Sequence, residues 1–203
     1  MTHRFTLQLT RVQCLNEQVR EWGKDEMRMF GFAISRKGHL FATGYRSLGS
    51  YGEGDVRSDG IFPMTLVDTE LEDDGLEVLF YVWLVEEDGG GVRDSAAALE
   101  IEFRERFRAE ATQLLEFRFP RDCIPFTAFY KAALPLNLRI QDAGTKGRND
   151  EVYDPFEALI DRPTGGIAAT EASGQFFLRR SKRLGDYVLT FRYGYSQVPV
   201  ILG

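Results

Sequence analysis

The feature that most constrains the fold is a run of ten residues at 76–85, LEVLFYVWLV, in which all but one are apolar. Its β-branched and aromatic side chains favour an extended strand over a helix. In an extended chain both sides of the run are apolar, with Val78, Phe80, Val82 and Leu84 on one side and Leu79, Tyr81, Trp83 and Val85 on the other. A strand that is apolar on both sides needs cover on both sides, so the run predicts a central strand.

Further strands are predicted by alternating apolar residues at 5–14, 27–35, 40–45, 62–68, 136–140, 175–180 and 186–195. The stretches at 16–26, 47–60 and 164–174 are polar or rich in glycine, and we expect loops there. Residues 155–159 predict one helical turn. Residues 117–135 contain Pro120 and Pro125 and give no clear pattern.

One long helix is predicted at about 95–116, where apolar residues recur at spacings of three and four: Leu99, Phe103, Phe107, Ala111 and Leu114. Asp94 or Ser95 is suited to cap its start. The apolar stripe predicts a face that packs on the sheet.

About eight short strands and a single long helix, without repeated alternation of strands and helices, argue against a doubly wound parallel sheet. We therefore expect a mostly β fold, an antiparallel β-sandwich of the C2-like or Ig-like kind with the helix inserted between strands. The 203 residues are 43% hydrophobic and include 16 phenylalanines, which is enough for a sizeable core. No repeat or linker divides the chain, so a single domain over 1–203 is expected.

The formal net charge of −6 argues against binding to DNA or RNA, whose phosphates are met by clustered Lys and Arg. No stretch is long enough to predict a transmembrane segment, and the first residues do not resemble a signal peptide. We therefore expect a cytoplasmic protein, or one that is exported without an N-terminal signal.

The residues that commonly carry catalysis are few. The only histidines are His3 and His39, the only cysteines are Cys14 and Cys123, and neither a zinc-binding spacing nor a nucleophile motif surrounds them. Glycine-rich phosphate-binding motifs are also missing. The sequence therefore leans away from an enzyme and predicts no catalytic residues.

Carboxylates are the one enrichment, and they gather in the expected loops. Calcium prefers several hard oxygen ligands from loops, so these residues form a candidate calcium site: Asp25, Glu26, Asp55, Asp59, Asp73, Asp74, Glu87 and Asp88. Solvated turn residues are the simpler interpretation. A third interpretation is a hydrolase in which loop carboxylates act as general acid and base.

Basic residues gather where the last two strands should turn, and they offer a contact for an anionic membrane surface: Arg179, Arg180, Lys182 and Arg183. Such charges on a hairpin also keep the sheet edge soluble.

The arrangement of antiparallel strands, acidic loops, an inserted helix and a basic hairpin resembles the C2-like β-sandwich class. The resemblance is one of architecture, because the chain lacks the pair of Asp-x-Asp loops of that class. Its calcium residues therefore cannot be carried over by position.

These observations favour a non-enzymatic binding module with another protein as partner, of the sort that accompanies bacterial effectors, toxins or defence systems. The alternatives are calcium-dependent binding of a membrane or ligand, and a hydrolase that uses loop carboxylates. Apart from calcium, no cofactor is expected.

Overall fold

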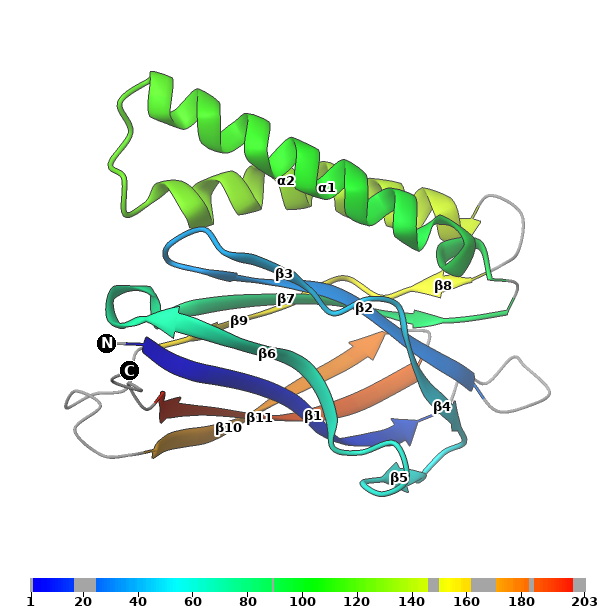
Figure 1. Ribbon diagram of the computed structural model, residues 1–203. Helices are drawn as coiled ribbons and strands as arrows, with labels where there is room; N and C mark the ends of the chain where they lie inside the picture. The colour runs from blue at the N-terminus through cyan, green and yellow to red at the C-terminus, as the bar shows by residue number, and fades with distance from the viewer. Residues whose placement is uncertain are drawn as a thin grey trace.

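The fold consists of two antiparallel sheets packed face to face, with two helices on the outer face of one sheet (Figure 1). The structure is a computed structural model, and it describes residues 2–16, 25–88, 90–145, 150–161, 171–182 and 185–198. Residues 171–182 are described by their main chain only. The predicted mostly β, antiparallel sandwich is confirmed. A second helix accompanies the single helix that the sequence predicted.

Sheet A contains five strands, and β1 lies at its centre. β1 pairs with β11 on one side and with β6 and β5 on the other, while β10 pairs with the outer side of β11. The bounds are β1 Thr2–Asn16, β5 Val56–Arg57, β6 Met64–Glu72, β10 Glu171–Lys182 and β11 Gly185–Gln197. The predicted C-terminal hairpin is therefore present as β10 and β11.

Sheet B contains six strands, and β2 and β7 form its centre. β2 pairs with β7 on one side and with β3 and β4 on the other, while β8 and β9 pair with the outer side of β7. The bounds are β2 Asp25–Ser35, β3 Leu40–Ala42, β4 Arg46–Tyr51, β7 Val78–Glu86, β8 Glu151–Val152 and β9 Phe156–Ile160. A short 3-10 helix, η1 at Asp73–Gly75, leads from β6 into β7.

β7 is the central strand that the apolar run predicted, and each of its faces belongs to a different core. Val78, Phe80, Val82 and Leu84 lie in the core between the two sheets. The alternate residues face the helices, where Leu79, Trp83 and Val85 are buried and Tyr81 is partly buried.

The helical layer consists of α1, Gly91–Glu116, and α2, Ile124–Thr145, which lie side by side over sheet B (Figure 1). Phe103 of α1 stacks on Phe32 of β2, with ring centroids 4.1 Å apart. The buried residues of α1 include the predicted stripe at Leu99, Phe103, Phe107 and Leu114. The sequence therefore placed the inner face of α1 correctly.

The prediction from the sequence was wrong about α2. This helix spans most of 117–135, where no element was predicted, and the whole of 136–140, where a strand was predicted. Pro125 lies in the first turn, where a missing N–H costs no hydrogen bond, so it does not interrupt the helix. Leu136 and Ile140 are four residues apart, which fits one face of a helix as well as alternate positions of a strand.

Three further predictions need correction. The loop expected at 47–60 contains most of β4 and all of β5, because these segments pair with the distant strands β2 and β1. The helical turn expected at 155–159 is the edge strand β9, whose position is set by pairing with β7.

The third correction concerns the loops expected at 16–26 and 164–174. Asn16 ends β1, Asp25 and Glu26 begin β2, and residues 171–174 begin β10. The remaining residues of both predicted loops, 17–24 and 164–170, lie outside the described part of the chain.

Candidate functional site

α2 is held on β7 by aromatic packing and one polar link. The Phe129 ring lies 5.8 Å from the Tyr81 ring and 5.2 Å from the Phe103 ring, measured between centroids. The indole Nε1 of Trp83 donates a hydrogen bond to Oδ1 of Asn137 at 3.0 Å. These contacts fix which side of α2 faces the sheet, and so which side faces away from it.

The outward side of α2 carries large apolar residues in place of the charges usual on an exposed helix face. Tyr130, Leu134 and Leu138 follow one another at a spacing of four, and 42%, 70% and 64% of their surface is exposed. We call these three residues the apolar row.

The apolar row adjoins an uncovered part of sheet B. Glu157 and Leu159 of β9 lie opposite Tyr81 and Leu79 of β7, so they point to the side of the sheet that carries the helices. Leu159 is nevertheless 52% exposed. α2 therefore covers β7 and leaves the outer face of β9 open.

Glu157 of β9 lies next to Tyr130 of α2. Partial burial, together with the charge of nearby Glu157, raises the pKa of Tyr130 to about 12. The apolar row, Glu157 and Leu159 thus form one continuous surface, which we call the α2–β9 face.

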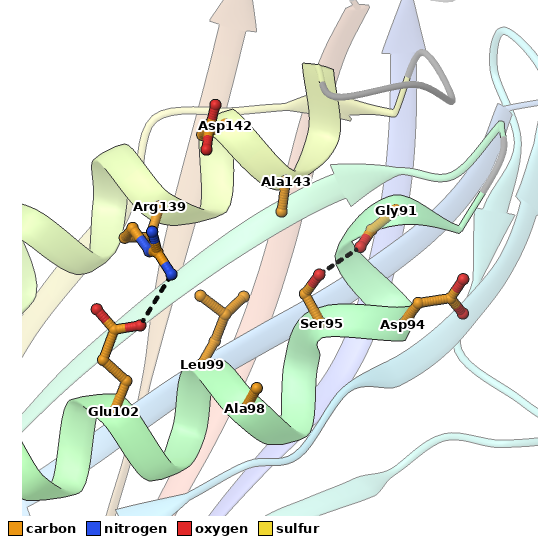
Figure 2. Close-up of a pocket in the computed structure, with 9 residues that line it drawn as sticks. All are labelled: Gly91, Asp94, Ser95, Ala98, Leu99, Glu102, Arg139, Asp142 and Ala143. Atoms are coloured by element: carbon orange, nitrogen blue, oxygen red, sulfur yellow. Dashed lines mark hydrogen bonds and ion pairs between the residues drawn. The ribbon is translucent and has the colours of Figure 1, made fainter.

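A groove lies between the first half of α1 and the last half of α2, with a volume of about 430 Å³ (Figure 2). Glu102 and Arg139 form an ion pair across it at 3.4 Å, and the hydroxyl of Ser95 donates a hydrogen bond to the carbonyl of Gly91. The lining residues include no histidine or cysteine: Gly91, Asp94, Ser95, Ala98, Leu99, Glu102, Arg139, Asp142 and Ala143. Since the Ser95 hydroxyl is bound to a carbonyl rather than to a base, the groove offers no activated nucleophile.

A pair of buried acids lies at one end of the core between the sheets. Asp25 and Glu86 are only 3% and 1% exposed, and the hydroxyl of Tyr187 donates a hydrogen bond to Asp25. Burial and the neighbouring carboxyl groups, first Asp25 and then Glu151, raise the pKa of Glu86 to about 9. Glu86 is therefore protonated at neutral pH, which avoids placing a second charge in the core. The tyrosine on β11 and the acid on β2 join the two sheets.

Another acidic residue caps α1, and the sequence did not identify it. The carboxylate of Asp150 accepts hydrogen bonds from the backbone N–H groups of Gly90 and Val92, each at 2.9 Å. The predicted caps, Asp94 and Ser95, lie inside the first turns of the helix. The true cap comes from a residue about 60 positions away, so local spacing could not reveal it.

The candidate calcium ligands are spread over the molecule. Asp25 lies in the buried pair, and Glu26 contacts Arg28 on the exposed side of β2. Asp55 accepts a hydrogen bond from the backbone of Gly52 at 2.9 Å, and Asp59 is exposed in a turn.

The remaining candidate ligands mostly have basic partners. Asp73 bonds to His3, Asp74 pairs with Lys37, and Glu87 lies between Arg28 and Arg93. Asp88 is exposed two residues beyond the end of β7. Across the described ranges, no three His, Cys, Asp or Glu side chains are arranged to hold a metal ion. Calcium binding stays a prediction.

The basic hairpin cannot be described at the level of side chains. Arg179, Arg180 and Lys182 lie in β10, where the main chain alone is described, and Arg183 lies outside the described residues. No helix in the described part of the chain has an apolar stretch long enough to cross a membrane.

The chain matches no protein-family model, no curated protein and no solved structure. The likeness to C2-like sandwiches therefore remains one of architecture. The α2–β9 face was not predicted, because its helix was not recognised and its strand was taken for a helical turn. The spacing of four between Tyr130, Leu134 and Leu138 was the one signal in the sequence that pointed to it.

Proposed function

We propose that this protein is a non-enzymatic binding module and that its α2–β9 face docks another protein. The observation that carries the proposal is the apolar row on α2. Two leucines and a tyrosine point away from the protein's own core, and the tyrosine, Tyr130, lies next to Glu157 of β9, the strand that carries the exposed Leu159. Apolar residues gathered on one surface are typical of a protein interface.

The shape of this face indicates what part of a partner would fit. α2 forms a side wall, and the outer face of β9 forms a floor next to it. A helix or strand of the partner that lies on β9 and against the side of α2 would cover Leu159 and the apolar row together. Burial of this surface would contribute about 25 cal/mol per Å² of apolar area removed from water.

The polar surroundings suit a protein partner better than a charged small ligand. Lys131 pairs with Glu110 at 2.8 Å, and Arg139 pairs with Glu102. Both pairs join α2 to α1, so these four charges neutralise one another along the α1 side of α2. The apolar row thus has a polar border on that side, as the apolar centre of a protein interface usually has.

Site-specific photo-crosslinking in the cells that produce the protein tests the proposal. A photo-reactive amino acid replaces Leu134 of the apolar row, and in a second variant it replaces Ile101, which is 59% exposed on α1. We expect a defined protein adduct from position 134 and none from position 101. The adduct protein, once purified, should bind the wild-type chain.

The double variant Leu134→Lys/Leu138→Lys then measures the contribution of the row. Because two lysines would place unpaired charges in a surface that becomes buried on binding, we expect the Kd to rise at least about tenfold, which corresponds to about 1.4 kcal/mol. Ile101→Lys is the matched control and should leave the Kd unchanged. Equal adducts at both positions, or an unchanged Kd in the double variant, would refute the proposal.

A further inference from the structure

β9 is the edge of sheet B next to the apolar row. It pairs with β7 without a register shift over Val78–Val82, and no other strand in the described residues pairs with it. Edge strands of monomers are protected by charged residues, proline, bulges, a short length or a covering element. β9 has five residues, Phe156–Ile160, and within them Glu157 is the single charge, with no proline and no register shift.

We infer that the partner on the α2–β9 face is a second copy of this chain, whose β9 pairs antiparallel with the first β9 about a twofold axis through Ala158. The inference rests on the proposed function and names the partner of the same face. The two copies of sheet B would form one continuous sheet, with both helical layers on the same side. An interface of this kind uses the same surface on both copies.

The order of residues in β9 selects this register. With Ala158 on the axis, all five residues pair, Glu157 lies opposite Leu159 of the second copy, and Phe156 lies opposite Ile160. A register centred on Glu157 would place two glutamates directly opposite each other, which is destabilising. A register centred on Leu159 would place Glu157 opposite Asp161 of the second copy. Only the central register avoids like charges and pairs every residue.

The helices fit the same arrangement. Neighbouring strands lie about 4.8 Å apart, so the two copies of β7 would lie three steps, or about 14 Å, from each other. A helix with its side chains is about 10–12 Å wide, so helices placed over the two β7 strands would approach each other above the β9 pair. Tyr130 and Leu134 lie on the flank of α2 nearest this gap, and Leu159 lies in its floor. Pairing would bury all three.

Disulfide trapping tests the register directly. The background is Cys123→Ser, because Cys123 is exposed while Cys14 is buried. Residues directly opposite in an antiparallel pair have Cα atoms about 4.5–5.5 Å apart, which is within the range that a disulfide spans. We therefore expect Ala158→Cys to form a covalent dimer under mild oxidation.

Positions next to the axis provide the matched controls. Glu157→Cys alone should not cross-link, because its copies are diagonal neighbours about 7–8 Å apart, and Leu159→Cys alone should not for the same reason. A mixture of the two variants should cross-link, because residues 157 and 159 lie opposite each other. Both positions are exposed, so this pair remains informative if Ala158→Cys fails to fold.

The outcomes separate this inference from the proposed function. Failure of the mixture to cross-link, or equal cross-linking by each single variant, would overturn self-pairing through β9. If the photo-crosslinker at position 134 then captures a different protein that binds through the apolar row, the proposed function stands without the dimer. If position 134 captures nothing in cells and the cysteines do not cross-link, both fall.

Discussion

The two faces of β7 are covered in different ways. On the inner face, the second sheet closes the core and even encloses the acid pair of Asp25 and Glu86. On the outer face, two helices cover β2 and β7 but stop short of β9, whose Leu159 is exposed. The inner interface is thus closed by the second sheet, whereas the outer interface ends in an exposed apolar surface.

The largest effect should separate buried from exposed positions of α2. Phe129 is fully buried and contacts β7 and α1, so Phe129→Ala should lower the free energy of unfolding by about 3–5 kcal/mol. Leu134→Ala, on the outward side of the same helix, should change it by less than about 0.5 kcal/mol. Urea unfolding at a concentration where the chain is monomeric measures both, and a large loss for Leu134→Ala would then mean that the apolar row serves folding.

The inner interface should respond to pH. Below the ordinary pKa of a glutamate, Glu86 is protonated both folded and unfolded, so its contribution to stability is fully present. Because its folded pKa is raised to about 9, stability should fall as pH rises towards that value, by at most about 1.4 kcal/mol per pH unit. Glu86→Gln removes this titration.

Urea unfolding between pH 5 and pH 8 makes the comparison, and groups that titrate in both proteins cancel in the difference. We expect the wild-type free energy of unfolding to decline more steeply with pH than that of Glu86→Gln. Parallel pH dependences in the two proteins would show that Glu86 does not hold its proton in the fold.

A smaller effect concerns the start of α1, which Asp150 caps. Asp150→Ala leaves the N–H groups of Gly90 and Val92 without their acceptor and should lower stability by about 1–2 kcal/mol. Asp94→Ala, at the cap position that local spacing suggested, should cost less. Thermal unfolding ranks the two variants, and the reverse order would contradict the assignment of the cap.

The smallest effect is a gain in stability at the turn between the helices. Arg118 has a φ of 54°, and the N–H of Phe119 bonds to the carbonyl of Leu114, which is the usual end of a helix in a left-handed residue. Glycine adopts this conformation without strain, so Arg118→Gly should raise stability by about 0.5–1 kcal/mol. Arg121→Gly is the control, and an equal gain from it would rule out backbone strain as the cause.

How much the sequence could reveal also differs between the two faces of β7. The nearly unbroken apolar run predicted that both faces of the strand are covered, and apolar residues at spacings of three and four predicted the buried stripe of α1. What covers a face is a tertiary property, however, and the sequence did not specify it. Leu136 and Ile140 fit a strand and a helix equally, and their assignment depends on the buried cluster that they share with Trp83.

The candidate site was harder still to predict. Tyr130 and Leu134 differ from core residues only in their exposure, which depends on where α2 lies relative to β9. β9 itself is defined by pairing with a strand some 80 residues earlier in the chain. The acidic loops led to the prediction of a calcium site because charged residues can be identified from the sequence. An exposed apolar surface can be identified only once the fold is known.

Sedimentation equilibrium of the wild-type chain beside Leu134→Lys/Leu138→Lys tests self-association through the α2–β9 face most directly. The account predicts that the wild-type chain approaches twice its mass of 23.1 kDa as concentration rises, while the folded double variant remains at the single mass. A wild-type chain that stays at the single mass throughout, or a double variant that associates equally well, would contradict it.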